Sequence, residues 1–152
     1  MASSKPKGRV NPVPDGYHTV TAYIFVPGIA RLLMYLQEAF GAQVIERMDE
    51  PDGSVGFAQV QLGDSRIMLS EARGDWKPMP CGIHLYVEDA DATYRQAIEA
   101  GGRSLMEPSD QPHGDRMAGV RDVCGNYWWI ATRVEDVSPE EVTRRMREAA
   151  GG

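Results

Sequence analysis

Few side chains in this sequence are of types that could carry out chemistry. His84 lies in an alternating, strand-like pattern, where an imidazole could bind a metal ion or form hydrogen bonds. The Gly114-Asp115-Arg116 segment could bind an anionic ligand, or it could be a turn in which Asp115 and Arg116 form a local ion pair. Neither Ser70 nor Cys124 has a histidine partner at an evident spacing, so a nucleophilic mechanism is not favoured.

The pattern around His84 predicts a strand that leads into a helix. From Gly82 to Val87, apolar side chains alternate with other residues, as in a half-buried strand. From Ala90 to Ala100, apolar residues recur at helical spacing, and the pair Gly101-Gly102 supplies a stop. His84 is therefore expected on one face of a strand that packs against this helix.

The same strand and helix pattern occurs earlier in the chain, where the helix is expected over 29–40. Val87 follows Val26 by 61 residues, and Gly102 follows Gly41 by the same interval. The Gly125-Asn126 turn follows Gly63-Asp64 by 62 residues, a one-residue slip that a loop can absorb. The spacing predicts two copies of a strand-helix-strand-strand-strand module.

The repeat divides the chain into five parts. Residues 1–16 are expected to be a disordered tail, 17–74 the first module, 75–79 a linker and 80–133 the second module. Residues 134–152 should form a C-terminal helix and tail, because Ser138-Pro139-Glu140-Glu141 has the pattern of a helix start. Trp76, in the linker, could act as a lid or lie in an interface.

Composition limits the classes of function. A net charge of -6 without a basic cluster argues against nucleic acid as a partner. The sequence has no apolar run long enough to cross a membrane and no signal-peptide pattern, so a cytoplasmic protein is expected. Two cysteines without CxxC spacing, Cys81 and Cys124, are expected to be free thiols.

Five segments of the chain match a known family: Tyr23-Ile24-Phe25-Val26, Ala39-Phe40-Gly41-Ala42, the run from His84 to Ala92, Gly114-Asp115-Arg116, and the run from Asp122 to Trp129. They resemble the PhnB-like branch of the vicinal oxygen chelate superfamily. This superfamily includes glyoxalase I, bleomycin-resistance and fosfomycin-resistance proteins, and extradiol dioxygenases. The resemblance covers about residues 17–137 and is specific to the fold rather than to one activity.

The resemblance implies an α+β fold in which two tandem βαβββ modules form a curved, partly open, barrel-like cup with the helices outside. Alternation along the first strand of each module then divides the side chains between the helices and the cup. The residues expected to face the cup are Thr21, Tyr23, Phe25, Gly82, His84 and Tyr86.

In the metal-using relatives, the ligands come from the first and last strands of each module. The matching positions here are Thr21, Ile67, Gly82 and Trp129. None is a usual ligand for a divalent metal, so no metal cofactor is expected. The alternative is a displaced divalent metal at His84 and Glu71, serving a glyoxalase- or dioxygenase-like enzyme that stabilises an enolate or oxyanion.

The main hypothesis is a metal-independent binding protein of the bleomycin-resistance type that sequesters an aromatic or cationic small molecule in an aromatic cup. A homodimer is expected by resemblance, and the modules could pair within or between chains. Alternatively, the aromatic rings fill the cup as core, and the protein interacts through its sheet faces or C-terminal helix. The expected ligand-binding residues are Thr21, Tyr23, Phe25, Glu71, His84, Tyr86, Arg116, Tyr127 and Trp129.

Overall fold

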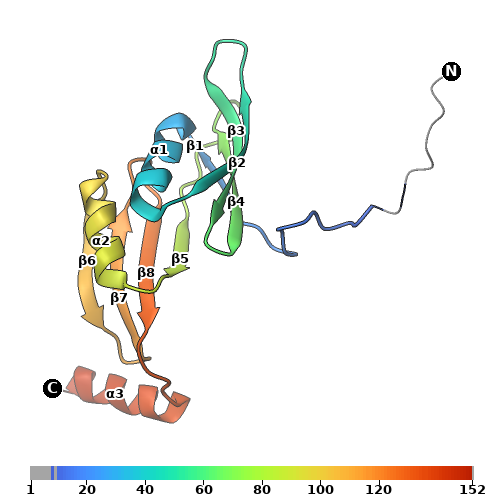
Figure 1. The fold of residues 1–152 in the computed structure, drawn as a ribbon. Coiled ribbons are helices and arrows are strands. Elements are labelled where there is room, and N and C mark those ends of the chain that lie inside the picture. The colour runs from blue at the N-terminus through green and yellow to red at the C-terminus, as the bar shows by residue number, and fades with distance from the viewer. Residues whose placement is uncertain (1–7, 9, 152) are drawn as a thin grey trace.

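The computed structural model describes residues 8 and 10–151. Of the segment 1–16 that was expected to be disordered, residues 1–7 and 9 lie outside this described part. The residues just before the first strand run outward from the body of the molecule (Figure 1). Among the described residues, no helix is long and apolar enough to cross a membrane.

Two βαβββ modules follow one another along the chain (Figure 1). The first contains β1 (Tyr23–Val26), α1 (Ile29–Phe40), β2 (Gln43–Asp49), β3 (Val55–Leu62) and β4 (Ser65–Glu71). The second contains β5 (Gly82–Tyr86), α2 (Ala90–Glu99), β6 (Arg103–Asp110), β7 (Asp115–Arg121) and β8 (Tyr127–Arg133). The helix α3 (Pro139–Gly151) ends the chain.

The two sheets have the same topology. Their strand orders are β1-β4-β3-β2 and β5-β8-β7-β6, and in each sheet the first strand of the module runs parallel to the last. The remaining neighbours are antiparallel. The predicted α+β class and the predicted pair of βαβββ modules are therefore confirmed.

Local sequence explains where the helices begin and end. Asp89 caps α2, because its carboxylate accepts a hydrogen bond of 3.0 Å from the backbone N–H of Ala92. The helix α1 ends at Gly41, whose φ of 66° lies in the left-handed region that glycine adopts without cost. The start of α1 has no such local cap, because Gly28 occupies that position.

One face of each sheet is buried against the helices. On the first sheet, the side chains of Ile24, Val26 and Leu69 are fully buried on this face. On the second sheet, Trp128 and Ile130 are fully buried in the same way. The two-residue period of the strands therefore divides each sheet into a helix-covered face and a free face.

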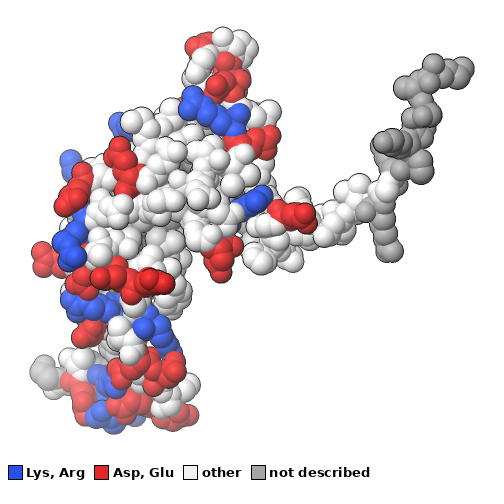
Figure 2. Space-filling view, in the orientation of Figure 1, with Lys and Arg blue, Asp and Glu red and all other residues white. Residues whose placement is uncertain are grey.

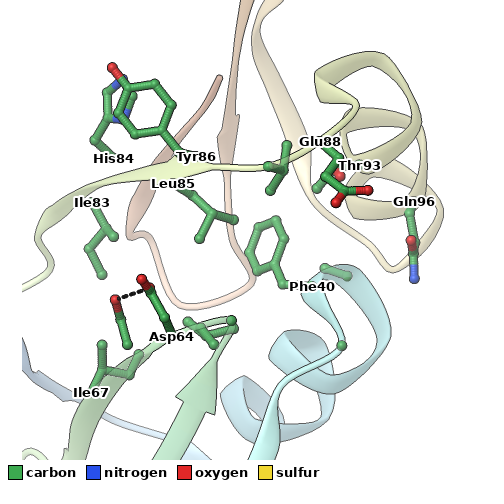
Figure 3. Close-up of a pocket in the computed structure, with 16 residues that line it drawn as sticks. Phe40, Asp64, Ile67, Ile83, His84, Leu85, Tyr86, Glu88, Thr93 and Gln96 are labelled. Carbon is green, nitrogen blue, oxygen red and sulfur yellow. Dashed lines mark hydrogen bonds between the residues drawn. The ribbon is translucent and has the colours of Figure 1, made fainter. Parts of the chain in front are cut away.

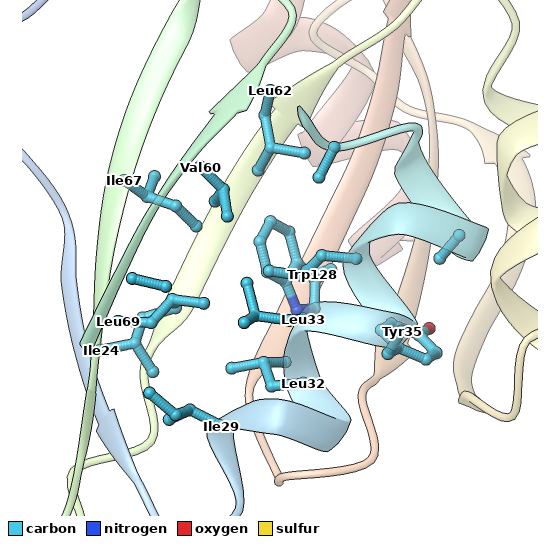
Figure 4. Close-up of a cluster of buried hydrophobic side chains, with 14 of the residues drawn as sticks. Ile24, Ile29, Leu32, Leu33, Tyr35, Val60, Leu62, Ile67, Leu69 and Trp128 are labelled. Atoms are coloured by element: carbon cyan, nitrogen blue, oxygen red, sulfur yellow. The ribbon is translucent and has the colours of Figure 1, made fainter. Parts of the chain in front are cut away.

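The two modules are joined through their helix-covered faces. The ring of Phe40, at the end of α1, lies 4.8 Å from that of Trp128 in β8. The hydroxyl of Tyr35 donates a hydrogen bond of 3.1 Å to the carbonyl of Ala97 in α2. Figure 4 shows Trp128 of the second module beside Leu33 and other core residues of the first. A single hydrophobic core therefore spans both modules, and neither free face takes part in it.

The structure contains the free thiols and the C-terminal helix that the sequence predicts. Cys81 and Cys124 are not joined by a disulfide. None of the described side chains of α3 is buried. Ion pairs connect side chains along the helix, such as that between Arg144 Nη2 and Glu141 Oε1 at 2.6 Å. Figure 2 shows acidic and basic side chains gathered around α3, whereas the middle of the view is largely uncharged.

Candidate functional site

The free face of the second sheet carries most of the side chains that were expected to face the cup. The register places His84 beside Trp129, and Gly82 beside Tyr127. The rings of His84 and Tyr86 lie 4.6 Å apart, tilted by 47°. Tyr127 is 44% exposed and Tyr86 is 62% exposed. We call this surface, made by His84, Tyr86, Tyr127 and Trp129, the second free face.

Trp129 lies over a glycine on the neighbouring strand. Gly119 in β7 is the register partner of Trp129 in β8. A Cβ atom on Gly119 would lie 2.5 Å from Cζ3 and 2.8 Å from Cε3 of the indole, which is closer than real contacts allow. Glycine at this position therefore lets the indole lie flat along the sheet, with its outer side half-exposed.

A buried carboxylate anchors one end of the second free face. Asp115 is 1% exposed, and its Oδ2 accepts a hydrogen bond of 2.9 Å from the hydroxyl of Tyr86. Arg133 donates to Oδ1 at 3.3 Å, and the His113 Nε2 lies 3.3 Å from Oδ2. Because these groups hold Asp115 in place, the phenol of Tyr86 has a defined orientation.

The same contacts shift two pKa values. Burial raises the pKa of Asp115, but the hydrogen bonds from Tyr86 and Arg133 and the nearby His113 together bring it below its ordinary value. The pKa of Tyr86 is raised, chiefly because its hydroxyl donates to the Asp115 carboxylate. Tyr86 therefore keeps its proton, and its oxygen can still accept a hydrogen bond from a ligand.

The free face of the first sheet is also aromatic. The ring centroids of Tyr23 and Phe25 lie 4.2 Å apart, and Phe57 lies beside Tyr23. Trp76, from the linker, stacks on Phe25 at 5.7 Å with the planes 9° apart, and it remains 66% exposed. Thr21 is half-buried just before β1. We call the surface made by Tyr23, Phe25 and Trp76 the first free face.

Glu71 does not lie on a free face, so its predicted orientation is wrong. Its Oε1 accepts a hydrogen bond of 2.7 Å from the backbone N–H of Gly28, and its Oε2 accepts one of 3.0 Å from Ile29. The carboxylate thus supplies the cap that α1 lacks locally, and its negative charge suits the positive end of the helix dipole.

The cause of this error is the register of β4. Met68 is the partner of Tyr23 in the first sheet, as Trp129 is the partner of His84 in the second. Met68, rather than Ile67, is therefore the counterpart of Trp129. Ile67 is buried toward the helix, and Glu71 shares its side of the strand.

Arg116 also points away from the second free face. Its Nε and Nη2 donate to the two carboxylate oxygens of Asp91 at 2.6 and 2.9 Å, and Nη1 lies 3.3 Å from Asp110. These hydrogen bonds, with that to Asp91 the largest, raise the pKa of Arg116. The local ion pair predicted between Arg116 and Asp115 is wrong, because adjacent residues on a strand face opposite sides.

The residues do not fit a divalent metal at the positions used by metal-binding relatives. With the corrected register, these positions hold Thr21, Met68, Gly82 and Trp129, none of which offers an imidazole or a carboxylate. The displaced pair of His84 and Glu71 is not assembled either, because Glu71 caps α1. In the part of the chain that the structure describes, no group of three or more His, Cys, Asp or Glu residues is placed to hold a metal ion.

A cavity of about 780 Å³ lies between the modules, behind β5. Figure 3 shows Ile83 and Leu85 directed toward it, together with Phe40 of α1 and Ile67 of β4. The side chains of His84 and Tyr86 lie on the other side of β5 (Figure 3). His84 and Tyr86 therefore border this cavity while their rings point away from it, and Asp64, Glu88 and Gln96 add polar groups to its lining.

Comparisons with known proteins agree with this architecture. The solved structures with similar folds include TioX from Micromonospora sp. ML1, with a TM-score of 0.64 and 19% identity, covering 76% of this chain and 99% of TioX. They also include a glyoxalase/bleomycin resistance protein/dioxygenase from Nocardioides, with a TM-score of 0.61 and 17% identity, covering 80% of this chain and 87% of that protein.

A curated relative is more similar in sequence. The uncharacterized protein Mb0911c from Mycobacterium bovis is 27% identical over 148 residues, which cover 88% of this chain and 95% of the relative. Residues 17–130 match the family model described as the glyoxalase/bleomycin resistance protein/dioxygenase superfamily. This match spans both modules, and the chain therefore belongs to the glyoxalase/bleomycin resistance protein/dioxygenase superfamily.

Proposed function

We propose that this protein binds a small aromatic molecule without a metal, in a cup formed when two chains associate. The observation that carries the proposal is the aromatic character of both free faces, which remain exposed while the opposite faces share one core. A function of the bleomycin-resistance or PhnB-like type, in which the bound compound is sequestered rather than transformed, fits this arrangement.

The exposure of large apolar side chains supports a homodimer. Tyr23 is 43% exposed, and Trp76, Met79, Tyr86 and Tyr127 are also exposed. Large apolar surfaces on soluble proteins commonly mark sites of association or ligand binding. Because the modules of one chain are joined through their helix-covered faces, the first free face would meet the second free face of a partner chain.

The chemistry of the free faces favours a flat ring, with or without a positive charge. Each stacked aromatic pair contributes roughly 0.5–1.5 kcal/mol beyond the burial of its area. A cation over the ring of Trp129, Tyr86 or Tyr23 gains a similar energy from the negative face of the ring. The oxygen of Tyr86, fixed by Asp115, offers an acceptor at the edge of the cup.

Binding without a metal is proposed because the described residues of the free faces lack a set of side chains that could coordinate one. His84 is the imidazole on the second free face, and its ring is in contact with Tyr86. Glu71, which would have been its partner as a ligand, is held by the backbone of Gly28 and Ile29. Binding by stacking and hydrogen bonding uses the groups that are on the free faces.

The test compares a cationic ring with a neutral one. We expect light scattering to show a dimer and calorimetry to show saturable binding of N-methylquinolinium, with 1-methylnaphthalene as its neutral counterpart. Trp129→Ala should weaken binding about tenfold, which corresponds to the loss of one ring contact of about 1.4 kcal/mol. Met146→Ala on the exposed surface of α3 is the control and should leave binding unchanged.

Two results would contradict the proposal. Binding that disappears when EDTA is added would show that a metal takes part. A chain that stays monomeric at all concentrations, with Trp129→Ala binding as tightly as the unmodified protein, would show that the free faces are not the binding surface.

A further inference from the structure

A second cavity, at one end of the second sheet, is lined by three arginines. Arg31 comes from α1, Arg103 from the start of β6 and Arg121 from the end of β7. The cavity has a volume of about 520 Å³ and is closed on one side by the turn between β7 and β8. It shares no lining residue with the cavity behind β5 or with the two free faces.

Two of these arginines face each other directly. Arg103 and Arg121 are register partners in the antiparallel pair of β6 and β7. Like charges at opposed positions on one sheet face destabilise the pairing. Among the described residues, no carboxylate lies within ion-pair distance of Arg103, Arg121 or Arg31. In a chain with 22 acidic residues, this cluster has been left without a protein counterion.

The acidic residue that lines the cavity, Asp122, accepts hydrogen bonds from groups other than the arginines. The carboxylate of Asp122 accepts hydrogen bonds from the backbone N–H groups of Cys124 and Asn126 at 2.8 and 2.9 Å. It also accepts from the indole of Trp128 at 2.8 Å. The lining therefore has three positive charges and one negative charge, which leaves a net charge of +2 (3 - 1 = 2) facing the cavity.

The arginines are partly fixed in place. A guanidinium nitrogen of Arg31 donates to the backbone carbonyl of Val123, and the guanidinium also interacts with the thiol of Cys124. A guanidinium has five N–H donors, so these two contacts do not use them all. Arg121 lies against Gly125, where a Cβ atom would be 3.5 Å from the Nη2 of Arg121. The planar fork of a guanidinium matches two oxygens of a phosphate group, and Arg is preferred over Lys for this reason.

We propose that this cavity binds a phosphate group, either as inorganic phosphate or as the head of a phosphomonoester. A phosphomonoester carries a charge of about -1.5 to -2 at pH 7, which matches the charge of the lining. A phosphate ion fills only part of 520 Å³, so the cavity has room for an organic group attached to it. The site does not depend on the aromatic cup and is tested with different probes.

The experiment measures binding of inorganic phosphate and of phenyl phosphate to the full chain by calorimetry at low salt. We expect saturable binding at one site per chain, with Arg103→Gln and Arg121→Gln each weakening it about tenfold. Arg147→Gln, on the exposed surface of α3, is the matched control and should change the affinity less than about twofold. Tighter binding of phenyl phosphate would identify a phosphomonoester as the ligand, and equal binding would identify free phosphate.

Thermal unfolding gives a second readout of phosphate binding that is independent of calorimetry. Without phosphate, Arg103→Gln and Arg121→Gln should unfold at or above the temperature of the unmodified protein, because each removes a repulsion. Phosphate should raise the unfolding temperature of the unmodified protein and of Arg147→Gln but not of these two variants. No saturable binding of either probe up to about 10 mM, or equal losses in all three variants, would overturn the proposal.

Discussion

Replacing Asp122 by asparagine is expected to destabilise the fold, because this carboxylate satisfies four donors in the turn before β8. Its Oδ1 accepts from the backbone N–H groups of Cys124 and Asn126, at 2.8 and 2.9 Å. Its Oδ2 accepts from the side-chain amide of Asn126 at 2.9 Å and from the indole of Trp128 at 2.8 Å. Asn126 and Trp128 are fully buried, so water cannot replace these bonds.

The magnitude follows from the number of donors left without an acceptor. An amide at position 122 keeps one oxygen and presents an NH₂ group to the other two donors. Each buried donor that loses its acceptor costs about 1–3 kcal/mol. Two such donors give an expected loss of about 2–6 kcal/mol for Asp122→Asn. For a chain of this length, a loss of about 3 kcal/mol, in the lower part of this range, corresponds to a decrease of roughly 6–12 °C in the unfolding temperature.

Urea unfolding followed by tryptophan fluorescence measures this loss directly. The matched control is Asp64→Asn, in the corresponding turn of the first module. The carboxylate of Asp64 is exposed and accepts a hydrogen bond from Ser65. Its replacement should change the free energy of unfolding by less than about 0.5 kcal/mol. A double-mutant cycle with Trp128→Phe should give a coupling of about 1 kcal/mol or more. A loss below about 1 kcal/mol for Asp122→Asn, with no coupling to Trp128, would show that these hydrogen bonds do not stabilise the fold.

Two further predictions concern carboxylates on and off the free faces. Glu71→Ala should lower the free energy of unfolding in urea by about 1 kcal/mol, because α1 loses its cap. The metal content measured by elemental mass spectrometry should not change. Loss of a bound metal in this variant would instead support the displaced metal site. The lowered pKa of Asp115 stabilises the fold above the unfolded value of 3.8, and this contribution is lost as the pH falls through the lower folded value. Stability measured from pH 7 to pH 2 should therefore fall less steeply below about pH 4 in Asp115→Asn than in the unmodified protein, and identical slopes would contradict this assignment.

Much of the fold could be predicted because local signals agree with the repeat. Alternation around His84 and the glycine stops after each helix predicted strands and helices close to those observed. The 61-residue interval between Val26 and Val87 placed both modules. The strand and helix patterns depend on neighbouring residues, and the interval is a repeat of these local patterns, so neither signal depends on which residues are in contact.

The errors arose where a single residue of register decides which face a side chain occupies. Counting four residues from Gly63 placed Ile67 and Glu71 in the cup. The position that matches Trp129, four residues after Gly125, is Met68, five residues after Gly63. Met68 and Leu69 are both apolar, so composition did not reveal the slip. Gly28 offers no side chain to cap α1, and the sequence around it does not indicate that Glu71, 43 residues later, accepts from these N–H groups.

The cluster around Asp115 was missed for a different reason. Tyr86, His113 and Arg133 come from β5, a loop and β8, and only the sheet register brings them to one carboxylate. The sequence alone favoured Arg116, the immediate neighbour, as the partner of Asp115. Sheet pairing across distant segments determines this cluster, and no local pattern indicates it.

The joining of the two modules through Trp128 and the helices has a genetic consequence. In the proposed dimer, the two free faces of one chain would belong to different cups, so each cup would combine the products of two gene copies. Chains carrying Phe25→Ala and chains carrying Trp129→Ala would each form only defective cups. Mixed dimers of the two would contain one doubly altered cup and one intact cup. Coexpression of two inactive alleles would then restore binding in about a quarter of all cups, the outcome known as complementation between alleles.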